Sequence, residues 1–104
     1  MRTTGHVLRG PASWYCNRDG SRAQLSSCHY QYPDTSAFNA YAAAGPTLRA
    51  ALGSGGRGRV VSVDGIAVKL VDWCQCYKGQ SNEKLLDLYS DVFLRTGGEV
   101  TIRW

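Results

Sequence analysis

The chain has 104 residues, 43% of them hydrophobic and 19% charged, and its formal net charge is +4. This composition is that of a globular protein, and the length allows one domain and excludes two. The positive excess lies in residues 1–59, where arginine outnumbers aspartate, so either an anionic partner or a solvated surface would suit that half. There is no basic run of the kind that binds nucleic acid, and nucleic acid is not an expected partner.

The beginning of the chain carries no clear pattern. Residues 1–10 predict an N-terminal tail, and residues 11–104 predict the single domain. The first residues lack the apolar stretch of a secretory signal, and no segment approaches the length of a membrane span. Residues 12–15 predict a short aromatic strand, and residues 16–36 predict a long irregular loop.

The middle of the chain predicts a helix and then a hairpin. Pro46 in the first turn and Gly53 after the end indicate a short helix over residues 45–53. Residues 59–63 and 66–71 are rich in β-branched side chains and flank Asp64-Gly65, which is a typical two-residue hairpin link.

Asp72 follows the second strand of this hairpin. The two-residue period of a strand places Asp72 on the same face as Ile66, Val68 and Leu70. A carboxylate in line with three apolar residues is expected to be partly buried or to line a cleft. The alternative is an aspartate that ends the strand by accepting hydrogen bonds from backbone N–H groups.

The last third of the chain predicts three further elements. Residues 85–88 form a strand, and residues 89–96 form a helix with Ser90 as N-cap and Gly97 at its end. Residues 100–104 alternate and predict the final strand. No internal repeat is evident in the residues.

Four cysteines allow two chemistries, a pair of disulfides or a zinc site. We expect Cys74 and Cys76 not to bond to each other, because the small ring that they would close is strained. Pairing with Cys16 and Cys28 would instead fasten the N-terminal segment to the centre of the chain. Zinc, with His29 as a further ligand, is the less favoured alternative because C-x-x-C knuckles are absent.

Five segments in order resemble the double-psi β-barrel domain of rare lipoprotein A, a lytic transglycosylase-like family that shares its barrel with expansins and barwin-like proteins. They are Ala-Ser-Trp-Tyr at 12–15, Tyr-Ala-Ala-Ala at 41–44, Val-Asp-Trp-Cys at 71–74, residues 86–93 and residues 98–104. The resemblance covers nearly the whole chain. It implies an all-β fold with two short helices, built as a six-stranded double-psi β-barrel.

In that family a groove across the barrel binds glycan, and the resemblance carries the acidic positions onto Asp72 and Asp87 as candidate catalytic or glycan-contacting residues. The chain departs from the family pattern at Ala44, which replaces a histidine, and at residues 72–75, which lack its arginine and proline. Catalysis therefore stays an open question, and a robust enzyme is the less favoured prediction.

Aromatic side chains offer a second kind of contact, because sugar rings stack on flat apolar faces. The candidates gather near the cysteines; they are Trp14, Tyr15, Tyr30, Tyr32, Trp73 and Tyr77. The alternative for each one is a place in the core. We expect a cell-wall polysaccharide as partner and no cofactor, in an extracellular, cell-surface or virion setting. The alternative function is a non-catalytic component of a phage virion that contacts other virion proteins.

Overall fold

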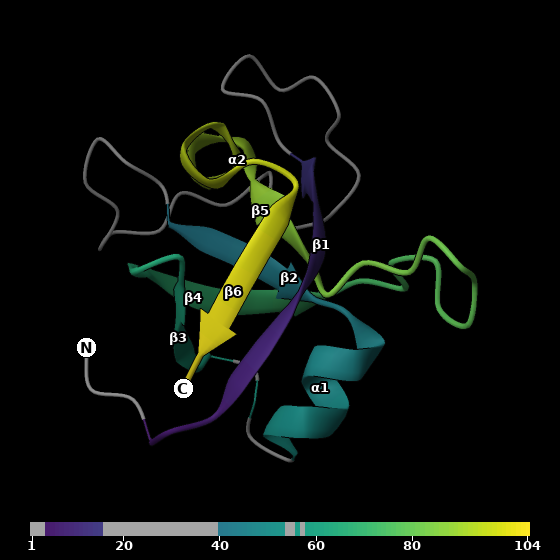
Figure 1. The fold of residues 1–104 in the computed structure, drawn as a ribbon, viewed down its shortest axis with the longest axis horizontal. Coiled ribbons are helices and arrows are strands. Elements are labelled where there is room, and N and C mark those ends of the chain that lie inside the picture. Colours follow the sequence, from purple (N-terminus) through teal and green to yellow (C-terminus); the bar gives the residue numbers. More distant parts are fainter. Residues whose placement is uncertain (1–3, 16–39, 54–55, 57) are drawn as a thin grey trace.

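The computed structural model describes residues 4–15, 40–53, 56 and 58–104. Within these ranges the strands are β1 (Val7–Tyr15), β2 (Tyr41–Ala44), β3 (Val60–Val63), β4 (Ile66–Trp73), β5 (Leu86–Tyr89) and β6 (Glu99–Arg103), and the helices are α1 (Pro46–Leu52) and α2 (Ser90–Thr96). The strands close into a barrel in the order β1-β5-β2-β4-β3-β6. The predicted six-stranded, mainly β architecture with two short helices is therefore confirmed (Figure 1).

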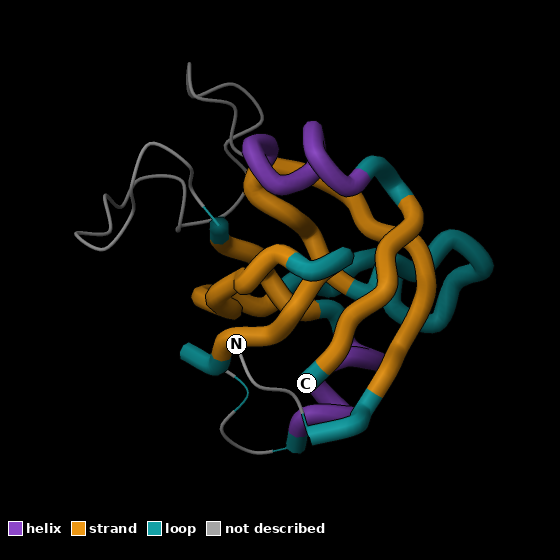
Figure 2. Tube along the Cα trace, turned by 60° about the vertical axis from the view of Figure 1, so that its left-hand side comes forward, coloured by secondary structure: helices purple, strands orange, loops and turns teal. Residues whose placement is uncertain are grey.

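The first three strands (β1–β3) and the last three strands (β4–β6) form two halves that occupy equivalent places in the barrel. Strands β1 and β5 pair in parallel, and so do β2 and β4, while the other neighbours are antiparallel. Exchanging β1, β2 and β3 for β4, β5 and β6 reproduces every one of these pairings. The helices obey the same exchange, because α1 follows β2 and α2 follows β5, and they lie toward opposite ends of the barrel (Figure 2).

The two helical segments match residue for residue at a separation of 44 positions. Pro46 corresponds to Ser90 at the start, and Gly53 corresponds to Gly97 after the end. Both glycines have positive φ, 73° and 76°, and each donates its N–H to the carbonyl four residues earlier. The sequence shows no repeat because the two halves share a backbone path and not a set of side chains.

The core fills the inside of the barrel with aliphatic side chains from every strand. Alternate strand residues point inward, as the two-residue period requires. The largest fully buried ones are Leu48, Leu70, Leu86, Leu88, Ile102, Val61, Val63, Val68, Val92 and Val100. Leu48 and Val92 come from corresponding positions of α1 and α2, and α1 adds Leu52 to the core.

The first strand is longer than the sequence predicts. It begins at Val7, and Val7–Pro11 pairs antiparallel with Glu99–Arg103 of β6. Residues 7–10 therefore belong to the barrel and not to a tail. The prediction missed them because Arg9, Gly10 and Pro11 break the usual strand pattern; Pro11 sits near the end of the β6 pairing, and there the ladder passes from β6 to β5.

The predicted hairpin is confirmed. Val60–Val63 and Ile66–Trp73 pair around Asp64 and Gly65, which both have positive φ, 49° and 86°. These angles are those of the type I′ turn that the Asp-Gly pair favours. The Asp64 carboxylate also accepts a 2.8 Å hydrogen bond from the Thr101 N–H, which ties the turn to β6.

Both predicted helices are present, with one difference at a cap. Helix α1 has Pro46 at its first position and Gly53 after its end, as predicted. Helix α2 begins at Ser90 itself, so the N-cap is Tyr89, and no side chain caps this end by a hydrogen bond. The strand β5 continues to Tyr89, and its pairing with β1 occupies the position before Ser90.

Candidate functional site

Two predicted site residues lie in one line across the barrel wall. The register pairs Ser13 of β1 with Asp87 of β5, Asp87 with Ala43 of β2, and Ala43 with Asp72 of β4. Paired neighbours in a sheet project to the same face. We call Ser13, Asp87, Ala43 and Asp72 the cross-strand row. Ala12, Leu86, Ala42 and Leu70, which precede these residues on the same strands, all belong to the core.

The row is the outward face of the barrel wall, opposite the core. Its two carboxylates are separated by one strand, so their Cα atoms lie about 10 Å apart, two interstrand spacings. Ala43 stands between them with a side chain that is fully buried. The barrel therefore brings Asp72 and Asp87 onto one face and keeps them at separate positions.

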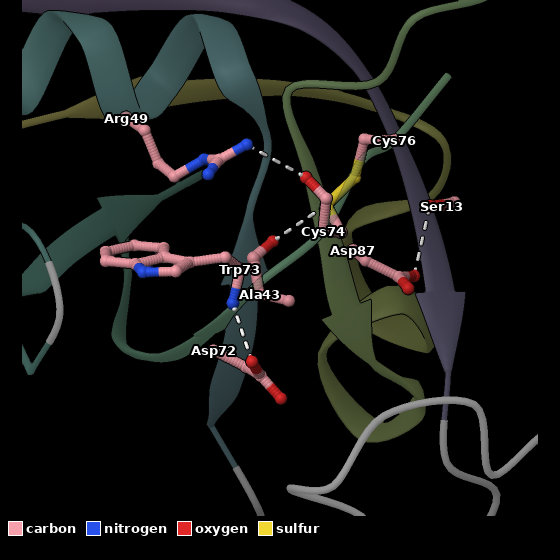
Figure 3. Close-up of a disulfide and its surroundings, with 8 residues drawn as sticks. All are labelled: Ser13, Ala43, Arg49, Asp72, Trp73, Cys74, Cys76 and Asp87. Carbon is pink, nitrogen blue, oxygen red and sulfur yellow. Dashed lines mark hydrogen bonds between the residues drawn. A yellow bond between two sulfur atoms is a disulfide. The ribbon is translucent and has the colours of Figure 1, made fainter. Parts of the chain in front are cut away.

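Asp87 is held rigidly at its end of the row. The residue is only 9% exposed, and its Oδ1 accepts a 3.0 Å hydrogen bond from the Ser13 hydroxyl (Figure 3). The strand β5 positions the carboxylate, three residues before α2 begins. Ser13 was not singled out in the sequence as a site residue; the only signal for it was its place in the Ala-Ser-Trp-Tyr segment.

Asp72 is partly exposed and makes a local contact. Its Oδ1 accepts a 2.8 Å hydrogen bond from the N–H of Trp73, the next residue along the chain (Figure 3). This is the backbone contact that the strand-ending alternative predicted. It fixes the direction of the carboxylate relative to β4.

A bulge in β4 corrects the predicted face of Asp72. The register with β2 runs from Ala42 opposite Leu70 to Ala43 opposite Asp72, so Val71 is an extra residue that this register skips. An extra residue reverses the alternation that follows it. Asp72 therefore leaves the face of Ile66, Val68 and Leu70, and Trp73 takes the inward position and packs against the core.

The two tryptophans predicted to bind glycan, Trp14 and Trp73, both point away from the row. Trp73 lies under the guanidinium of Arg49, with the Arg49 Cζ 5.7 Å from the ring centroid. Trp14 lies on the same side of β1 as Ala12, and its ring contacts that of Phe93 of α2 in a tilted arrangement, with the centroids 6.5 Å apart. In the exchange of the two halves, Trp14 corresponds to Trp73, and Phe93 corresponds to Arg49. Each tryptophan thus packs on the helix of the other half, and Trp73 also packs against the core.

The other aromatic candidates do not join the row either. Tyr77 is 52% exposed and lies in the turn after β4. Tyr15 ends β1, but its side chain lies outside the described part of the chain, as do Tyr30 and Tyr32. Among the described residues, the aromatic groove predicted around Asp72 is therefore not assembled by Trp14 and Trp73.

Cys74 and Cys76 form a disulfide with each other, so the prediction that they would not is wrong (Figure 3). The reason is the backbone after β4. Cys76 and Tyr77 have positive φ, 48° and 60°, and the Lys78 N–H donates to the Gln75 carbonyl at 2.9 Å. This left-handed turn brings the two cysteine Cα atoms to 5.1 Å, within the range of a disulfide.

The bond also changes the zinc alternative. Zinc binds cysteine as thiolate, and the sulfurs of Cys74 and Cys76 are joined to each other. Among the described residues, no cluster of three or more His, Cys, Asp and Glu side chains could hold a metal ion. Cys16, Cys28 and His29 lie outside the described residues.

Two comparisons with known proteins give no match. Neither a protein-family model nor a curated protein matches the chain. None of the helices in the described ranges has the length and apolar character needed to cross a membrane. The barrel and the cross-strand row are therefore the features that bear on function.

Proposed function

We propose that this chain is a double-psi barrel domain that binds cell-wall glycan at the outward face of β1, β5, β2 and β4. The observation that carries the proposal is the cross-strand row, which places the partly exposed Asp72 and the nearly buried Asp87 on one face, with the buried Ala43 between them. The exchange of β1, β2 and β3 for β4, β5 and β6 supports a barrel built from two interlocked, equivalent halves.

The carboxylates of the row can accept hydrogen bonds from the hydroxyl groups of a polysaccharide. Sugar hydroxyls donate hydrogen bonds, and ionised carboxylates accept them more strongly than neutral groups do. The Ser13 hydroxyl fixes Asp87, and the Trp73 N–H fixes Asp72, so both acceptors are positioned before a ligand arrives. Preorganised acceptors lose little entropy on binding.

The spacing of the row favours binding over double-displacement cleavage. A retaining glycosidase needs carboxyl groups about 5 Å apart. Asp72 and Asp87 project in the same direction from strands two places apart, so their carboxyl groups remain near the Cα spacing of about 10 Å. We infer two separate contacts along a glycan strand.

Binding to insoluble peptidoglycan tests the proposal. We expect the wild-type domain to sediment with purified sacculi, and Asp72→Asn or Asp87→Asn to weaken binding by roughly tenfold, because each removes a charge-assisted hydrogen bond. Asp64→Asn is the matched control, since Asp64 lies in the β3–β4 turn and its amide oxygen can still accept from Thr101. A wild-type domain that stays in the supernatant would overturn the proposal.

Cleavage is tested in the same incubation. Released anhydro-muropeptides would show that the domain is a lytic enzyme. Their loss in Asp72→Asn would identify Asp72 as the catalytic acid. Binding without release is the expected result, because the chain departs from the family pattern at Ala44 and at residues 72–75.

A further inference from the structure

The Cys74–Cys76 disulfide is poorly explained as a fastening for the fold. A disulfide stabilises a protein mainly by shortening the unfolded chain, and the effect grows with the length of the loop that it closes. This bond joins residues only two positions apart. It therefore constrains very little of the unfolded chain, and stabilisation of the fold does not account for the bond.

The turn that carries the bond adopts an unfavourable backbone conformation. Cys76 and Tyr77 are consecutive non-glycine residues with positive φ, in a turn closed by the hydrogen bond from Lys78 to Gln75. Such a turn normally uses asparagine, aspartate or glycine, because a side chain crowds the left-handed conformation. When the disulfide opens, one constraint that holds Cys76 in this conformation is lost. The disulfide therefore shares the task of holding this turn with the backbone hydrogen bonds from Lys78 to Gln75 and from Lys84 to Cys76.

The two sulfurs lie in different surroundings. Cys74 is 8% exposed, and its Sγ lies 3.5 Å from the carbonyl oxygen of Ala43, which a reduced thiol can use as a hydrogen-bond acceptor. Cys76 is more exposed and lies in the surface turn. An incoming thiolate therefore reaches Cys76 before it reaches Cys74.

A cation lies beside the buried cysteine (Figure 3). The Nη2 of Arg49 donates to the Cys74 carbonyl oxygen at 3.4 Å. The Nε of Arg49 is buried and has no hydrogen-bond partner within the described part of the chain. The guanidinium is hydrogen-bonded to the backbone of Cys74, and a positive charge near a cysteine favours its thiolate, which opposes the effect of burial on Cys74.

We propose that Cys74 and Cys76 form a reversible redox couple that exchanges with thiols, an activity separate from glycan binding. A thiolate attacks the Sγ of Cys76, the bond between the two cysteines breaks, and Cys74 leaves as a thiolate, in the residue whose carbonyl oxygen accepts from Arg49. A second thiol attacks the incoming sulfur of the mixed disulfide and releases Cys76. The protein disulfide gains two electrons and two protons, and two thiols become one disulfide.

Glutathione buffers test the couple in the full chain. Trypsin cleavage after Lys69 and Lys78 yields a peptide of residues 70–78 that holds both cysteines and no other, so its alkylation reports this pair alone. We expect the reduced fraction to change reversibly with the ratio of reduced to oxidised glutathione while the far-UV circular dichroism stays constant. A pair that is reduced only when the fold is lost would overturn the proposal.

Alkylation rates test the assigned roles. In Cys74→Ser the remaining Cys76 should react with iodoacetamide at least roughly tenfold faster than Cys74 reacts in Cys76→Ser, because only Cys76 lies in the exposed turn. Arg49→Gln should slow the reduction of the wild-type pair by glutathione, whereas Arg59→Gln, an exposed arginine, should not. Equal rates for the two single cysteines would contradict the roles. Should either serine variant fail to fold, the buffer experiment still decides whether the couple exists.

Discussion

At the scale of single residues, Glu83 joins the loop after β4 to helix α1. Its Oε1 accepts a 3.0 Å hydrogen bond from the Gly79 N–H, and its Oε2 accepts a 2.8 Å hydrogen bond from the Thr47 hydroxyl. The Gly79 N–H, followed by the Thr47 hydroxyl and then the charge of Lys78, lowers the pKa of Glu83, and slight burial opposes them. Both hydrogen bonds favour the ionised carboxylate.

The sign of this shift gives a pH dependence. The pKa of Glu83 is lower in the folded chain than its ordinary value of 4.5, so the contact adds stability above that value and loses it as the pH falls through the folded pKa. We expect the Gly79 amide resonance to shift and its hydrogen exchange to accelerate in acid, as followed by NMR. Glu83→Gln should abolish the acid step at Gly79, and an unchanged step in that variant would show that another group titrates there.

At the scale of elements, Gly45 allows α1 to start against the entry to β5. The Gly45 N–H donates to the Leu85 carbonyl at 2.8 Å. A Cβ at this position would lie 2.5 Å from the Lys84 carbonyl oxygen and 2.7 Å from that of Leu85. The φ of Gly45 is −78°, which any residue adopts, so glycine is required here only by the close approach of two backbones.

Gly45→Ala should therefore destabilise the domain by overpacking. We expect a loss of about 2–3 kcal/mol in the free energy of unfolding, because neither carbonyl is on a flexible side chain. Gly98→Ala is the control, since its nearest neighbour would be an ordinary 3.7 Å away. Urea unfolding measures both, and equal losses would show that the close approach at Gly45 is not the cause.

At the scale of the whole molecule, neither half of the barrel can form its own sheet. Every neighbouring pair in the barrel joins a strand of the first half to a strand of the second. His6, just before β1, lies beside Trp104, just after β6, because their backbones exchange hydrogen bonds of 3.0 and 3.2 Å and their rings stack at 5.3 Å. The halves are therefore interlocked, and the covalent link between them lies in the Asp64-Gly65 turn.

A circular permutant tests this organisation. We expect a chain that starts at Gly65, joins Trp104 to Met1 by a short flexible linker and ends at Asp64 to fold cooperatively with the far-UV circular dichroism of the wild type, because the start of β1 lies beside the end of β6. It should be less stable, since the hairpin link is lost. The separate fragments 1–64 and 65–104 should each stay unfolded. A folded fragment would contradict the interlocked halves.

The sequence by itself determined the features that depend on a few adjacent residues. Asp64-Gly65 predicted the hairpin because those residues favour the left-handed turn, and Pro46, Gly53 and Gly97 marked helix ends for similar local reasons. Strand alternation placed Val68 and Leu70 on one apolar face, and both are fully buried. The resemblance to a barrel family predicted six strands and two helices, and these are present.

The tertiary structure decided the features that depend on partners far along the chain. Pairing with β6 makes residues 7–10 a strand, and pairing with β2 creates the bulge that moves Asp72 to the outward face beside Ala43. The left-handed turn after β4 joins Cys74 to Cys76. Predictions from hydrophobic periodicity or residue spacing assume that the backbone continues regularly. The long-range contacts bend the backbone at these positions. The cross-strand row and the disulfide therefore could not be predicted from the sequence.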